Sequence, residues 1–143
     1  MKQTINKEYQ LFTLYHKNKF NILFHLVCGF IYMSVLFKLL NKNQNLGILI
    51  YMFLLLLTMN NIFLTLTICG GIYLFLNYYF TQKMSNLKLL IIFILFYNLP
   101  FLSHYSTNES NKDVVDRFYE NPLNFPVIIN IIYLLPFSFK RLI

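Results

Sequence analysis

Three histidines are the residues of this sequence best suited to chemistry: His16, His25 and His104. An ionisable side chain in or near an apolar span is costly, and it is therefore a candidate for function. Neutral imidazoles bind first-row transition metals, and an iron oxygenase needs histidines, often with a carboxylate, and open coordination positions. The loop after His104 offers Glu109 and Glu120 as possible carboxylate partners. The histidines form either one metal site or separate hydrogen-bonding positions.

The spacing of the histidines sets a condition on the metal site. His16 and His25 are nine residues apart, so one unbroken helix would place them on opposite faces. A metal site therefore requires a turn at residues 17–20. Asn21 and His25 are four residues apart and share a helix face, and Asn21 is suited to cap the start of the first span. His104 ends a later apolar run, so the three histidines can meet only where helix ends converge.

The composition identifies the elements that must position these side chains. The chain has 143 residues, of which 57% are hydrophobic and 12% are charged, with a mean hydropathy of +0.54. Soluble domains carry about 25% charged residues, so we expect an integral membrane protein in a lipid bilayer. The formal charge of +7 comes mostly from cations that flank apolar runs, where they reach lipid headgroups. No basic patch on a soluble module is present, which argues against a nucleic-acid partner.

The apolar runs predict an all-α fold, a polytopic membrane helical bundle of four to five membrane segments with an N-terminal interfacial helix. These runs cover residues 21–40, 46–59, 61–80, 89–104 and 126–139. We expect a single membrane-embedded domain over residues 1–143. Its parts are an interfacial segment (1–20), the main bundle (21–104), a polar loop (105–125) and a final apolar segment (126–143).

Several local features leave alternatives open. In the first twenty residues, Ile5, Tyr9, Phe12 and His16 share one helical face, which is typical of an interfacial helix, although a polar tail is an equal alternative. Only two asparagines divide residues 46–80, which form either a helical hairpin or one bent segment.

Three other residue types carry structural expectations. Pro100 is expected to kink or end its helix, and Pro136 interrupts the last run. Cys28 and Cys69 lie in apolar runs and are expected to be small buried hydrophobic residues rather than a disulfide. The pair Gly70-Gly71 is expected to be a helix-packing notch.

The segment from Tyr15 to His25, with the sequence YHKNKFNILFH, resembles the opening motif of a membrane family. That family is typified by the yeast 2-hydroxy-fatty-acid dioxygenase of phytosphingosine breakdown, which yields odd-numbered fatty acids. The tyrosine, both histidines and both asparagines are in place, and Lys19 stands where proline is usual. A later block, from Tyr97 to His104, is similar to the family in its phenylalanine and histidine. The chain is similar to a divergent member.

This resemblance implies an iron(II)-dependent enzyme of the endoplasmic reticulum or an equivalent membrane. Such an enzyme shortens a 2-hydroxy fatty acid by one carbon with O₂ (fatty acid alpha-oxidation) and releases CO₂. It implies that the three histidines bind Fe²⁺ and that Tyr15, Asn18 and Asn21 support them through hydrogen bonds. The alternative is a non-enzymatic small membrane protein, either a degenerate relative, a scaffold or a lipid-binding subunit. A channel or transporter is less favoured, because no charged residue lies in the middle of a span.

Overall fold

The computed structural model describes residues 2–81, 83–110, 116 and 125–143, which are helical or irregular and contain no strand. The prediction of an all-α protein is confirmed for these residues. The chain forms two compact units. The terminal unit comprises Met1–Val27 and Asn98–Ile143, and the central unit comprises Cys28–Tyr97. Two long helices contribute residues to both units. The single membrane-embedded domain stays a prediction.

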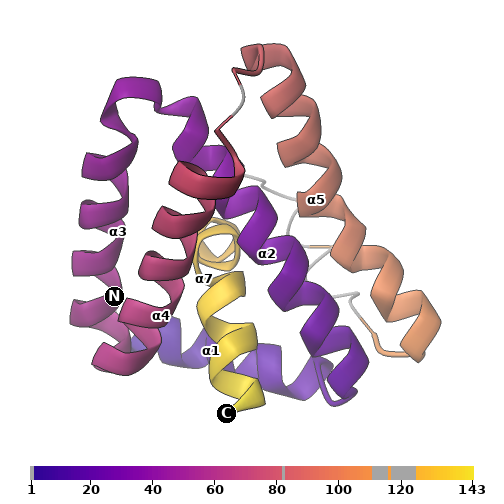
Figure 1. Ribbon diagram of the computed structural model, residues 1–143. Coiled ribbons are helices and arrows are strands. Elements are labelled where there is room, and N and C mark those ends of the chain that lie inside the picture. Colours follow the sequence, from indigo (N-terminus) through magenta and orange to yellow (C-terminus); the bar gives the residue numbers. More distant parts are fainter. Residues whose placement is uncertain (1, 82, 111–115, 117–124) are drawn as a thin grey trace. The chain divides into compact units, whose positions relative to one another are not determined.

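The helices follow the predicted apolar runs closely (Figure 1). Their bounds are α1 Lys2–Tyr15, α2 Lys19–Leu39, α3 Gln44–Met59, α4 Ile62–Leu74, α5 Asn86–Thr107 and α7 Phe125–Leu142. A short 3-10 turn, Asn41–Asn43, precedes α3, and a π-helical segment, Phe75–Tyr79, continues α4.

In the terminal unit, α1 packs against α7 through the face that its sequence pattern predicts. Ile5 and Phe12 are buried on this face. The ring of Phe137 contacts Phe12 and Tyr9, with centroid separations of 5.8 and 5.4 Å. Residues 2–15 therefore form a packed helix, and the alternative of a simple polar tail is wrong.

In the central unit, α3 and α4 pack side by side as a helical hairpin (Figure 1). Asn60 adopts a left-handed backbone conformation with φ 49°, which ends α3 and reverses the chain. Asn61 then caps α4, because its side-chain oxygen accepts a hydrogen bond from the backbone N–H of Leu64 at 2.9 Å. Of the two alternatives for residues 46–80, the hairpin is confirmed.

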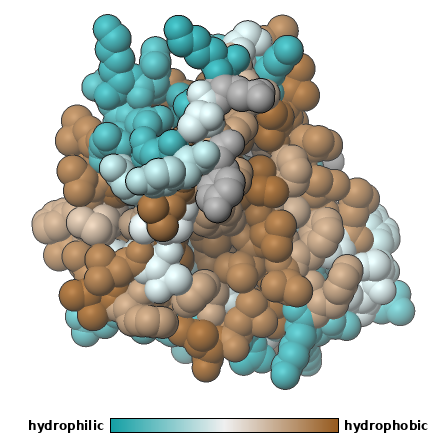
Figure 2. All heavy atoms as spheres, in the orientation of Figure 1, coloured by the Kyte–Doolittle hydropathy of each residue, from teal (hydrophilic) through white to brown (hydrophobic). Residues whose placement is uncertain are grey.

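Three helical segments are long and apolar enough to cross a membrane: α2, α5 and the segment Asn41–Met59, which includes α3. The apolar stretch Ile62–Tyr78 is shorter. Large hydrophobic side chains are exposed on the hairpin, including Phe53 and Phe63, and hydrophobic residues cover much of the surface visible in Figure 2. These observations support a membrane protein, whereas four to five spans and an interfacial position for α1 stay predictions.

Neither proline ends its helix, and whether Pro100 kinks α5 stays a prediction. Helix α5 contains Pro100 and continues to Thr107, and α7 contains Pro136 and continues to Leu142. Proline removes one backbone hydrogen bond, and neighbouring helices or side chains can compensate for it in apolar surroundings. As a result, Pro100 and His104 lie on the same helix, and both belong to the terminal unit.

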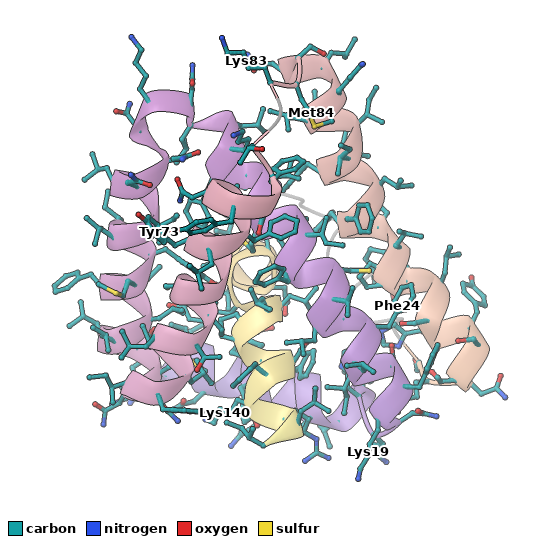
Figure 3. All side chains as sticks on the ribbon, in the orientation of Figure 1. Lys19, Phe24, Tyr73, Lys83, Met84 and Lys140 are labelled. Carbon is teal, nitrogen blue, oxygen red and sulfur yellow. The ribbon has the colours of Figure 1, made fainter. Side chains whose placement is uncertain are left out.

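The glycine pair lies beside a pocket between α3 and α4. The pocket has a volume of about 310 Å³ and its lining is mostly apolar. The lining residues are Asn45, Ile48, Leu49, Met52, Leu66, Cys69, Gly70 and Tyr73, the last of which is labelled in Figure 3. A Cβ atom on Gly70 would meet no atom within 4 Å, whereas one on Gly71 would lie 3.2 Å from the Phe30 ring. Only Gly71 therefore forms the expected packing notch. Cys28 and Cys69 are buried and unpaired, as predicted.

Candidate metal centre

The turn that the metal site requires is present between α1 and α2. Helix α1 ends at Tyr15 and α2 begins at Lys19, so residues 16–18 break the helix. Asn18 caps α2, because its Oδ1 accepts a hydrogen bond from the Phe20 N–H at 2.8 Å. The expectation that Asn21 is the cap is wrong. Asn21 lies inside the first turn and is completely buried.

The three histidines meet in the terminal unit. His16, His25 and His104 are buried, and each offers one ring nitrogen such that the three atoms lie within 4.8 Å of one another. The ring centroids of His16 and His25 are 4.4 Å apart, and those of His16 and His104 are 4.7 Å apart. In the part of the chain that the structure describes, this cluster could hold a metal ion.

The backbone fixes the tautomer of two of these imidazoles. His16 Nδ1 lies 2.7 Å from the Phe12 carbonyl oxygen, and His25 Nδ1 lies 2.9 Å from the Asn21 carbonyl oxygen. A carbonyl only accepts hydrogen bonds, so each Nδ1 carries the proton and each neutral ring keeps a lone pair on Nε2. Metal-binding histidines commonly have this arrangement, in which the second nitrogen is held by a backbone carbonyl.

The two Nε2 atoms then face each other at 3.0 Å. Two lone pairs at this distance repel unless a cation lies between them, and the cation is either a proton or a metal ion. Two nitrogen ligands that bind one ion about 2.1 Å away at a right angle are themselves about 3.0 Å apart. The separation of the Nε2 atoms therefore fits two neighbouring ligands of one metal ion.

A shared proton is disfavoured at neutral pH. Burial and, to a smaller extent, the nearby His104 lower the pKa of His16 to about 4, although the Phe12 carbonyl and Glu109 favour protonation. The aromatic surroundings explain the burial. The Phe12 ring stacks on His16 with centroids 3.9 Å apart, and its edge approaches His25 at 6.2 Å. His16 is therefore neutral and available as a ligand.

Asn21 connects the cluster to the end of α5. Its amide nitrogen donates a hydrogen bond to Glu109 Oε2 at 2.6 Å and lies 3.4 Å from His104 Nδ1. The Ser103 hydroxyl donates to Asn21 Oδ1, and its oxygen also lies 2.7 Å from the Pro100 carbonyl oxygen of its own helix. The sequence pattern did not identify Ser103, because a serine next to a helical histidine gives no local signal of a partner 82 residues away. Phe12 could have been identified, since it precedes His16 by four residues on the predicted face.

The other predicted site residues have different positions. Tyr15 is the last residue of α1 and is partly exposed. Asn18 acts on the helix break rather than on a histidine. Glu109 is not a member of the histidine cluster, and its two oxygens accept hydrogen bonds from N–H groups. Burial raises the pKa of the Glu109 carboxyl, but these hydrogen bonds, with that from Asn21 the strongest, lower it overall. Glu120 lies outside the described residues.

The histidine cluster thus provides neutral nitrogen ligands in apolar surroundings. The nearby carboxylate of Glu109 accepts hydrogen bonds from N–H groups instead. Such a site can hold a transition-metal ion and leave coordination positions for other molecules. No protein-family model, curated protein or solved structure matches this chain.

Proposed function

We propose that this chain is a membrane-bound, iron(II)-dependent dioxygenase that shortens 2-hydroxy fatty acids by one carbon. The observation that carries the proposal is the separation of 3.0 Å between the Nε2 atoms of His16 and His25 beside His104. The resemblance of residues 15–25 to the 2-hydroxy-fatty-acid dioxygenase family supports it. The same resemblance supports the endoplasmic reticulum or an equivalent intracellular membrane as the location.

His16, His25 and His104 would hold the ion. Three nitrogen ligands leave half of a six-coordinate shell open, which is enough for a bidentate substrate and O₂. Because imidazoles are neutral, they leave the charge of the ion uncompensated, and a 2-hydroxy acid would bind it as an anion through its carboxylate and hydroxyl groups. Bound iron(II) would supply the electron-transfer chemistry that activates O₂.

The proposed reaction balances without another reductant. One O₂ is consumed for each 2-hydroxy acid, and the bond between carbons 1 and 2 breaks. Carbon 1 leaves as CO₂, carbon 2 becomes the new carboxyl carbon, and the remaining oxygen leaves as water. The substrate loses four electrons and O₂ gains them.

The protein's own side chains would exclude water, orient the ligands and attract the substrate. Phe12 covers one face of His16 and limits access of water to it. The hydrogen bonds from Nδ1 to backbone carbonyls hold the two Nε2 lone pairs in place. Lys17 and Lys19 are exposed at the helix break, and Lys19 projects from the first turn of α2 in Figure 3. Cations at this position would attract a carboxylate, while the alkyl chain of the substrate remains in the lipid.

The test uses the full chain, purified in detergent. Iron content is measured by mass spectrometry after anaerobic loading with Fe(II). The protein is then incubated with 2-hydroxypalmitate in air, and the acid one carbon shorter is quantified. We expect about one iron per chain and a stoichiometric loss of O₂. Palmitate is the matched control substrate, because it lacks the 2-hydroxyl group needed for chelation and should not be shortened.

The two parts of the proposal fail separately. Protein that binds no Fe(II) and makes no shortened acid would overturn both the metal site and the activity. Protein that binds metal through the histidines but leaves 2-hydroxy acids unchanged would support the alternative, a non-enzymatic membrane protein with a metal-stabilised fold.

A further inference from the structure

The chain reverses direction directly after α5 and brings Glu109 back toward the metal centre. Asn108 adopts a left-handed conformation with φ 53°. The backbone N–H of Glu109 donates to the His104 carbonyl oxygen at 3.1 Å, a bond typical of a helix that ends in a tight reversal. The position of Glu109 is therefore tied to the backbone of His104.

The Glu109 side chain accepts three hydrogen bonds, all from the segment between His16 and His25. Oε1 accepts from the backbone N–H groups of Lys17 at 2.5 Å and Asn18 at 2.7 Å. Oε2 accepts from the amide of Asn21 at 2.6 Å. The two N–H groups of Lys17 and Asn18 lie in the helix break, where no helical carbonyl is available to them. One carboxylate thus satisfies the donors of the break and reaches the side chain of Asn21.

These bonds also determine which way the Asn21 amide points. Its nitrogen must face the Glu109 carboxylate, because its oxygen there would place two acceptors against each other. The oxygen of Asn21 is therefore left to accept the bond from the Ser103 hydroxyl. The carboxylate orients the amide, and the amide contacts the region of His104.

We propose that Glu109 is a positioning residue of the metal centre, a carboxylate that fixes the helix break and orients Asn21 without binding the metal. Oε1 accepts two hydrogen bonds, which use both of its lone pairs, and Oε2 is directed at the Asn21 amide. Glu109 is also not a member of the histidine cluster that could hold a metal ion. The break sets where His16 lies relative to His25, so its geometry controls the distance between the two Nε2 atoms. This inference rests on the metal-binding part of the proposed function.

The test is an exchange of groups between positions 21 and 109. In E109Q, the new amide faces the amide of Asn21, so two donors oppose each other. In N21D, two carboxylates oppose each other. In the double variant N21D/E109Q, the carboxylate now at position 21 accepts from the amide now at position 109. The oxygen of that amide still accepts hydrogen bonds from the backbone N–H groups of the helix break, and the Ser103 hydroxyl still donates to position 21. Every donor in this network then faces an acceptor again.

The readout is Co(II) binding to the purified full chain, measured by the visible spectrum and by titration. We expect each single variant to bind Co(II) about 10–100-fold more weakly than the wild type. The double variant should return to within about twofold of the wild-type affinity. At saturating Co(II), the spectrum of E109Q should keep the wild-type shape, because the ligands are unchanged. D116N is the matched control, since it removes one carboxylate charge at an exposed position.

Each outcome decides a different question. Wild-type affinity in E109Q overturns the positioning role, and a changed Co(II) spectrum in saturated E109Q shows that Glu109 is itself a ligand. Weak binding in the single variants without recovery in the double variant overturns the proposed pairing with Asn21. Circular dichroism and thermal unfolding of every variant separate a loss of fold from a loss of binding. Wild-type protein that binds no Co(II) and no Fe(II) overturns the proposed function itself.

Discussion

Both units contain buried hydroxyls that bond to their own helix, such as that of Ser138 in the terminal unit, but the terminal unit adds bonds between distant residues. In the central unit, Ser34, Thr58 and Thr65 each donate to the carbonyl four residues earlier in the chain, at 2.7, 2.7 and 2.9 Å. In the terminal unit, Asn21 bonds to Ser103 and Glu109, which are 82 and 88 residues away in the sequence. A hydroxyl that bonds to its own helix satisfies itself in any packing arrangement. A network between distant residues is satisfied in only one arrangement, and this specificity is what a metal site requires.

The largest expected difference between the units concerns metal binding. His104→Ala removes one of the three proposed ligands, and we expect the affinity for Co(II) to fall more than about 100-fold. Thr58→Val in the central unit removes a buried hydroxyl that bonds within α3, so it should leave the affinity unchanged. Titration of both variants measures this contrast. Equal loss in both would show that the affinity reports general destabilisation.

Acid should destabilise the terminal unit through His16. Its pKa is about 4 in the folded protein and 6.5 as the ordinary value, so the unfolded chain binds the proton first as the pH falls. The contribution of His16 to the free energy of unfolding is therefore complete above pH 6.5. As the pH falls to about 4, this contribution decreases by about 3 kcal/mol. Denaturant unfolding measured across this range should show the loss, and His16→Gln should reduce it. Glu109 has a lowered pKa and acts in the same direction, but at lower pH.

Two serine substitutions compare the networks directly. Ser103→Ala leaves the buried Oδ1 of Asn21 without its donor, and we expect a loss of about 1–3 kcal/mol in the free energy of unfolding. Ser34→Ala removes a hydroxyl that donates to a carbonyl of its own helix, and the loss should be below about 1 kcal/mol. Thermal unfolding in the same detergent measures both. A larger loss in the central unit would contradict the comparison.

The smallest effect concerns the glycine pair of the central unit. Gly70→Ala adds a methyl group where no atom lies within 4 Å, so it should stabilise α4 by about 0.5–1 kcal/mol. In Gly71→Ala the methyl group would lie 3.2 Å from the Phe30 ring, so the gain should be smaller or reversed. Unfolding temperatures of the two variants provide the measurement. Neither variant should alter metal binding, because both glycines lie outside the terminal unit.

The sequence predicted the helices and the need for a turn near His16 because both depend on local pattern. Apolar runs end at polar residues, and the spacing of nine residues excludes one continuous helix. The convergence of His104 on the other two histidines was a hypothesis that spacing alone could not decide. Their positions depend on how α5 packs, which is a tertiary property.

Predictions from nearby residues alone were wrong where contacts between distant residues determine the structure. Asn18 and Asn21 are equally suited to cap a helix, and no nearby residue distinguishes them. Asn21 is buried by partners more than 80 residues away, which leaves Asn18 to cap α2. Pro100 was expected to kink or end its helix and Pro136 to interrupt the last apolar run, but both helices continue past the proline.

The division of the chain into units has a consequence for biosynthesis. The central unit is contiguous, so its hairpin can form while the ribosome is still producing the rest of the protein. The terminal unit combines residues 1–27 with residues 98–143. His104 and Glu109 are therefore made only after the whole central unit, long after His16. At about 5–20 residues per second, that delay is about 5–20 seconds. During this interval only two of the three histidines exist, so the proposed metal site is complete only when synthesis is well advanced.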